Sequence, residues 1–250
     1  SRSRSFHFLP ANRVAPAVNV SYTSANGRIV YQYQISNGAG AQAIGAFELA
    51  VGVPVDIDTP EPWRALKVQR PNVQPFLGFL RVVTDGEQRG RFSGGTRLDP
   101  IRLTSDYSPG LIETTFHGEP QSAASMLQAH GMTAGEFLNA ASPWVQQRLA
   151  ELDTQDRHRL RSLTIGPVAP LSADPVLAVR AEIERATQWP QMSILRDHAL
   201  KSPAPAERTA LIAWLSNLRS ASGPGLVTEF VDAMHWRLQR PVSQSQHGSR

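Results

Sequence analysis

The chain has 250 residues, 41% of them hydrophobic, which is enough apolar material for a buried core. It contains no cysteine, and this excludes disulfides, thiol catalysis and cysteine-ligated zinc. A formal net charge of +4 is small for this length and gives no support for specific nucleic-acid binding. No run of about 18 apolar residues occurs, so no membrane span is predicted.

Residues 1–13 are polar and basic and carry three apolar side chains, Phe6, Phe8 and Leu9, near their end. We predict a flexible tail here. The alternative is an exchangeable strand, in which these three side chains mediate self-assembly by pairing with the sheet edge of a neighbouring subunit. The chain begins without a methionine or an apolar leader, and we interpret this as a mature or trimmed N-terminus.

The region from residue 14 to residue 51 predicts antiparallel strands. Apolar and polar residues alternate in 14–22 and again in 28–35, and this period places the apolar side chains on one face of each strand. Asn26-Gly27 lies between the two runs and is among the strongest signals for a two-residue hairpin turn. One polar face per strand is typical of antiparallel sheets.

The next part of the chain continues with shorter strands. The segment 56–63 is rich in proline and aspartate and predicts a loop. Two strands are predicted on either side of a turn at Ser108-Pro109-Gly110, because proline and glycine favour the backbone angles of a type II turn. Several short strands with regular turn signals predict an immunoglobulin-like antiparallel β-sandwich. Its later strands are predicted at 65–68, 73–83, 89–92, 101–106 and 111–116.

After residue 120 the apolar period changes to that of a helix, so the fold class is α+β. We predict a helical insertion at 121–161, with a capping box at Thr133–Glu136, followed by a last sandwich strand within 162–170. The sandwich therefore comprises 14–120 together with 162–170. A helical appendage at 174–240 ends in a helical hairpin, and the polar residues 241–250 are predicted to be disordered.

The motifs of several common enzyme classes are absent, since HExxH, GxxxxGK[ST], GxGxxG and GxSxG do not occur. We therefore predict no catalytic residue, no metal and no cofactor. One alternative is a hydrolase with a non-local site that combines Ser105, Asp106 and His117 across the hairpin. A second is a calcium site in the acidic segment 56–61, although the spacing of an EF-hand is missing.

Three residues in the proline-rich segment are predicted to contact a ligand or partner. Trp63 is expected to be an exposed aromatic side chain that contacts a carbohydrate or a protein. Asp56 and Asp58 are the other two predicted contact residues.

Two pieces of sequence resemble segments of exported bacterial β-sandwich proteins of unknown function. They are TSDYSPGLIETTFHG at 104–118 and SLTIGPVAP at 162–170. The C-terminal sequence that begins LIAWLSNLRSASGPGLVTEF resembles the small helical tails appended to such domains. The resemblance implies export to the periplasm or the cell exterior and a non-catalytic sandwich, and it assigns no functional residue.

We therefore expect a non-enzymatic, exported module that binds a protein or carbohydrate partner, with another copy of itself included among the protein partners. One alternative is a structural subunit of a surface filament or layer, assembled by strand exchange through residues 1–14. The other is the hydrolase with a non-local site.

Overall fold

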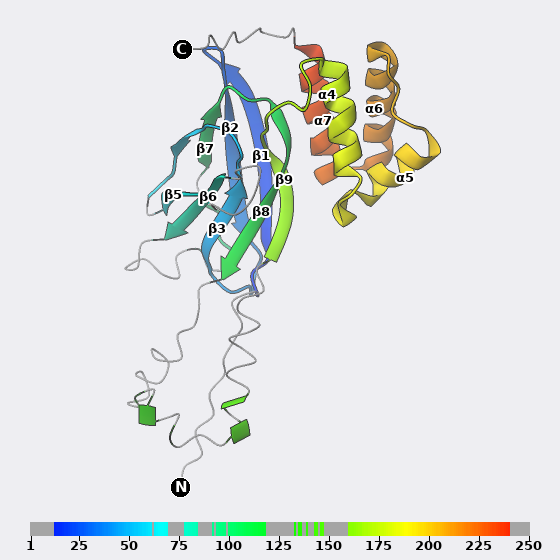
Figure 1. Cartoon of the computed structure of the whole chain (residues 1–250). Coiled ribbons are helices and arrows are strands. Elements are labelled where there is room, and N and C mark those ends of the chain that lie inside the picture. The colour runs from blue at the N-terminus through cyan, green and yellow to red at the C-terminus, as the bar shows by residue number, and fades with distance from the viewer. Residues whose placement is uncertain are drawn as a thin grey trace.

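The computed structural model describes residues 13–61, 63–69, 78–84, 92, 94–98, 100–118 and 160–240. It also describes eight single positions between 133 and 147. In this part of the chain, two antiparallel sheets are followed by a group of helices (Figure 1). The molecule is therefore a mixed α and β protein.

The first sheet has four strands in the order β1-β2-β7-β4. These strands are β1 (Pro16–Ala25), β2 (Arg28–Asn37), β7 (Ile101–Ser105) and β4 (Asp56–Asp58). The predicted hairpin turn joins β1 to β2, and Asn26 and Gly27 both have positive φ, 51° and 78°. Two successive positive φ values define a type I′ turn, whose twist matches that of the flanking strands.

The second sheet has five strands in the order β5-β6-β3-β8-β9. These strands are β5 (Trp63–Gln69), β6 (Gly78–Thr84), β3 (Ile44–Ala50), β8 (Pro109–Gly118) and β9 (Leu160–Pro167). The last predicted strand is therefore present, and it pairs with β8 along its whole length, from Pro109 opposite Pro167 to Phe116 opposite Leu160.

Both sheets contribute side chains to one buried cluster. Tyr31 and Tyr33 of β2 are fully buried there together with Phe47 of β3 and Phe116 of β8. The rings of Phe47 and Phe116 stack with their centroids 6.0 Å apart. The hydroxyl of Tyr33 donates a hydrogen bond to the carbonyl oxygen of Ile165 at 2.9 Å, so β2 is also tied to β9 by a buried polar contact.

A second cluster lies between the helices and the start of β8. The helices are α4 (Pro175–Ala186), α5 (Ser193–Lys201), α6 (Arg208–Ser222) and α7 (Leu226–Gln239), with a short 3-10 helix η2 (Pro190–Met192) before α5. Apolar positions at helical spacing, such as Leu211, Leu215 and Leu218 of α6, are fully buried in this cluster. Leu111 of β8 and Ile165 of β9 join them from the sheet.

Two side chains of α4 complete the hydrogen bonding of β8. Strand β3 pairs with β8 only from Thr114 onward, so none of the described strands pairs with Leu111 on that side. Its N–H donates to Glu182 Oε1 at 3.1 Å, and its carbonyl accepts from Arg185 Nη2 at 3.3 Å. The helix thus supplies the donor and the acceptor that a neighbouring strand would supply.

Two local predictions are wrong. Residues 56–58 form β4 rather than a loop, because their backbone pairs with Arg102–Thr104 of β7. Pro109 and Gly110 begin β8 rather than forming the turn. The glycine is needed for packing, since a Cβ there would overlap the side chain of Val168 and lie 3.0 Å from Glu182 Oε1.

The predicted capping box is confirmed. The N–H of Thr133 donates to Glu136 Oε2 at 2.8 Å, and the N–H of Glu136 donates to Thr133 Oγ1 at 3.2 Å.

Candidate interaction surface

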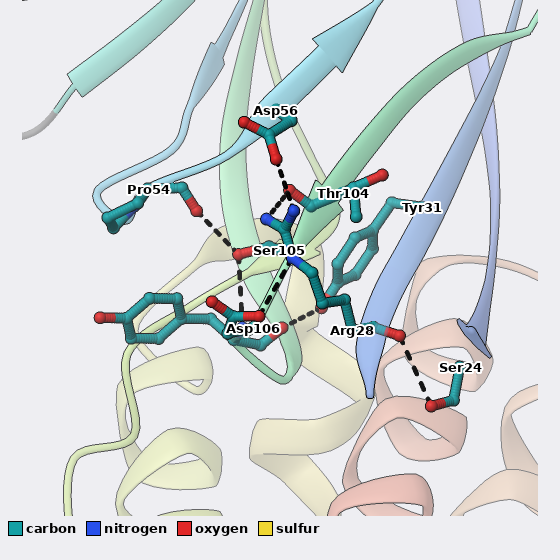
Figure 2. A network of polar contacts seen from close by, with 9 residues as sticks. Ser24, Arg28, Tyr31, Pro54, Asp56, Thr104, Ser105 and Asp106 are labelled. Carbon is teal, nitrogen blue, oxygen red and sulfur yellow. Dashed lines mark hydrogen bonds and ion pairs between the residues drawn. The ribbon is translucent and has the colours of Figure 1, made fainter. Parts of the chain in front are cut away.

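Arg28, the first residue of β2, connects three segments at one end of the first sheet (Figure 2). Its Nη1 lies 2.5 Å from Asp56 Oδ2 and its Nε lies 3.1 Å from Asp106 Oδ1, while Nη2 donates to the carbonyl of Thr104 at 3.2 Å. The hydrogen bond with Asp56 is the main cause that raises the pKa of the Arg28 guanidinium. All three charged side chains are well exposed, so these ion pairs add little to the free energy of unfolding. We assign them the role of orienting the Asp56 and Asp106 side chains relative to β2.

The hydroxyl of Ser105 is occupied by the backbone around it. It donates to the carbonyl of Pro54 at 2.9 Å and accepts from the N–H of Tyr107 at 3.3 Å (Figure 2). A serine nucleophile needs a base that takes its proton, and the acceptor here is a carbonyl oxygen. Asp106 is paired with Arg28 instead of with a histidine.

His117 lies at the far end of β8 from this turn. It is eight positions after Pro109, which corresponds to about 26 Å of extended strand. Its Nε2 lies 3.7 Å from Glu48 Oε1 on β3. The hypothesis that Ser105, Asp106 and His117 form a triad is therefore wrong.

Asp56 and Asp58 occur on the exposed face of β4, with Ile57 between them packed against the core. Asp56 is paired with Arg28, and Asp58 Oδ2 lies 4.0 Å from Arg102 Nη1. In the part of the chain that the structure describes, no group of three or more histidine or carboxylate side chains is placed to hold a metal ion. Both carboxylates are accessible to a partner, and their contact role stays a prediction.

Trp63 is buried, with 4% of its surface exposed, so the expectation of an exposed aromatic contact is wrong. It begins β5, and its ring lies between Phe47 and Phe92 at centroid distances of 5.9 and 5.7 Å. A large apolar ring that follows a proline-rich segment can be buried in the core as readily as it can be exposed to solvent. Sequence alone does not distinguish the two outcomes.

Strand β1 is the outermost strand of the first sheet, and among the described strands only β2 is hydrogen-bonded to it. The carbonyl of Ala15 accepts from the N–H of Gly38, which shows that odd-numbered residues turn their backbone groups toward β2. Alternation along an antiparallel strand then turns the backbone groups of the even-numbered residues outward. These residues are Pro16, Val18, Val20, Tyr22 and Ser24. Among the described residues, none hydrogen bonds to these outward backbone groups.

The two faces of β1 differ in character. Val18, Val20 and Tyr22 pack against the core, as the alternation predicts. The opposite face is exposed and carries small uncharged side chains, and the strand as a whole has no charged residue. Natural edge strands usually carry a charge, a bulge or an interior proline that discourages pairing, and β1 has its proline only at the first position.

The other strand edges are shorter or partly capped. Strand β4 has three residues. On β5, the carbonyl of Trp63 accepts from Thr59 Oγ1 at 3.0 Å, and on β9 the carbonyl of Ile165 accepts from Tyr33. Strand β9 lies beside β1 without a hydrogen-bonded ladder between the two strands (Figure 1).

Helix α7 places acidic and aromatic side chains next to Tyr22 of β1. The rings of Tyr22 and Trp236 meet edge to face with centroids 5.9 Å apart. Burial raises the pKa of the Tyr22 hydroxyl, and the nearby carboxylates of Asp232 and Glu229 raise it further. The Asp232 carboxylate is bound by Arg219, whose Nε lies 2.6 Å from Oδ1.

Replacing Glu229 with glutamine is expected to stabilise the protein at neutral pH. Burial, with a smaller contribution from Asp232, raises the pKa of Glu229 above its ordinary value of 4.5. A raised carboxyl pKa means that the folded state favours the protonated form, so stability is lost as the pH rises through the folded-state pKa. Thermal unfolding from about pH 3 to about pH 8 should show the two proteins converging at the acidic end. Glu184→Gln makes the same change at an exposed position of α4 and is the control.

The predicted self-assembly residues Phe6, Phe8 and Leu9 lie outside the described residues.

The edge position of β1 was not predicted from the sequence, because periodicity identifies a strand and its faces but not its neighbouring strands. The one signal available was the absence of charge between Pro16 and Ala25.

Within the described residues, no helix combines the length and the apolar character required to cross a bilayer.

No protein-family model matches the chain, and no curated protein matches it. Among solved structures, the chain is similar to an uncharacterised protein from Nocardia farcinica with an immunoglobulin-like fold. That similarity has a TM-score of 0.32 and 10% identity, and it covers 40% of this chain and 75% of that one. The comparisons therefore assign the chain to no family.

Proposed function

We propose that the chain is a non-enzymatic interaction module that binds an extended polypeptide as an added strand along the outer edge of β1. The observation that carries the proposal is the row of outward backbone groups on Val18, Val20, Tyr22 and Ser24. Strand addition takes its affinity from such main-chain groups, and the side chains at alternate positions select the partner.

The proposal includes an immunoglobulin-like sandwich arrangement of the two sheets and export from a bacterial cell. The cluster to which both sheets contribute supports the sandwich, because facing sheets of a sandwich share one core. Export rests on the sequence resemblance alone.

The chemistry of β1 defines the partner segment. On the core side, an added strand would lie beside Val18, Val20 and Tyr22, which favour apolar or aromatic neighbours. On the exposed side, it would lie beside Ala17, Asn19 and Ser21, which are small and uncharged. The expected partner therefore alternates apolar and polar residues.

Amide hydrogen exchange tests the proposal directly. The probe is a peptide selected from a phage library of random segments of about seven to ten residues, the length of an ordinary strand. On binding, the outward amides of Val18, Val20 and Tyr22 are expected to exchange at least about tenfold more slowly. The inward amides of Asn19 and Ser21 already bond to β2, and they provide the internal control.

Two substitutions at one position separate backbone pairing from side-chain packing. Val20→Pro removes one outward N–H and leaves the hydrogen bonds between β1 and β2 in place, whereas Val20→Ala keeps the N–H and shortens the side chain. The proline variant is expected to lose peptide binding and the alanine variant to retain it. Equal binding by the two folded variants would exclude strand addition at β1.

A further inference from the structure

We infer that the natural occupant of the β1 edge is the segment 3–9 of a second copy of this chain. This inference rests on the proposed function, because it names the partner of the same edge. The segment spans seven residues, as does the outward row from Val18 to Ser24. In its sequence, SRSFHFL, polar and aromatic residues alternate from Ser5 to Phe8.

The faces of the segment match those of β1. In an extended conformation Phe6 and Phe8 share one face, and Ser5 and His7 share the other. The aromatic face would lie beside Val20 and Tyr22, which contact both buried clusters. The polar face would continue the exposed, uncharged face of β1.

Charge favours one direction of the added strand. In antiparallel pairing, the N-terminal end of the segment, which carries Arg4 and is preceded by Arg2, lies toward the Tyr22 end of β1. The carboxylates of Glu229 and Asp232 on α7 both raise the pKa of the Tyr22 hydroxyl, so they lie near this end of β1. The basic end of the segment would therefore face the carboxylate of Glu229, since Asp232 is already paired with Arg219.

Donation between copies fits the path of the chain better than donation within one copy. The carbonyls of Arg13 and Ala15 accept hydrogen bonds from Gln42 and Gly38, so the chain is already directed along β1 when it reaches Pro16. Pairing with its own β1 would require a reversal within Pro10-Ala11-Asn12, which contains no glycine. Pairing with a second copy requires no reversal.

Light scattering after size exclusion tests the inference on the full chain. The mass is expected to be at least twice 27.4 kDa. Phe6→Asp combined with Phe8→Asp is expected to reduce it to a single copy, because the charges fall on the buried face. Ser5→Asp combined with His7→Asp places the same charges on the exposed face and should retain the assembly. A single-copy mass for the unmodified chain at every concentration, or equal masses for the two double variants, would overturn the inference.

Mixing experiments distinguish donation between copies from donation within a copy. The Phe6→Asp and Phe8→Asp variant keeps a working edge, and the Val20→Pro variant keeps a working segment. Each alone is expected to be a single copy, and their mixture is expected to form a one-to-one complex. Absence of that complex, with peptide binding at β1 retained, would overturn the inference and leave the proposed function standing. Failure of the peptide to protect the outward amides of β1 in the Phe6→Asp and Phe8→Asp variant, whose edge is vacant, would instead reject the proposed function itself.

Discussion

Replacing Glu182 with alanine is expected to reduce the free energy of unfolding by about 3–5 kcal/mol. The side chain is fully buried on α4, and Oε1 lies 2.5 Å from Arg185 Nη2 and accepts from the N–H of Leu111. Its Oε2 lies 3.7 Å from Nη1 of Arg237, which is itself buried. Burial lowers the pKa of the Arg237 guanidinium, and Glu182 opposes this effect, so the alanine variant leaves a buried charge without its partner.

Urea unfolding of the variant and of Glu184→Ala measures this effect. Glu184 lies on the same helix but is exposed, and its replacement is expected to change stability by no more than about 0.5 kcal/mol. The double variant Glu182→Leu with Arg237→Met removes both charges and should recover the part of the loss that comes from the unpaired Arg237, while the N–H of Leu111 stays without its acceptor. If Glu182→Ala were no more destabilising than Glu184→Ala, the ion pair would have no part in holding the helices to the sheet.

Replacing Trp63 with alanine is expected to cost about 3–5 kcal/mol, as a large-to-small change in a packed core does. The ring is buried between Phe47 and Phe92, so its removal leaves a cavity and two aromatic contacts unmade. Trp144→Ala is the matched control, because the same ring is removed from a position that is 71% exposed. Equal melting temperatures for the two variants would contradict the burial of Trp63.

The features that sequence reasoning predicted correctly are local. Alternation on β1 and β2, the Asn26-Gly27 turn and the Thr133–Glu136 capping box each depend on residues within a few positions of one another. The helices α6 and α7 were likewise readable from the spacing of their apolar residues.

The features that it missed depend on distant neighbours. Pro109-Gly110 has the composition of a turn, yet Gly110 is required because Val168 and Glu182 approach it from remote parts of the chain. Trp63 is buried because β3 and Phe92 supply its neighbours. The edge position of β1 follows from strand order, which no periodicity within a strand encodes.

The pairing of β8 with β9 has a consequence for how freely the chain can vary in length. These strands pair from end to end, although residues 119–159 separate them in sequence. The entropic cost of bringing the ends of a connection together grows only with the logarithm of its length, so halving or doubling the number of residues between β8 and β9 is expected to change the closure free energy by about 0.6 kcal/mol. Residues can therefore be inserted into or removed from the connection between β8 and β9 with little change in the free energy of forming the β8–β9 pair.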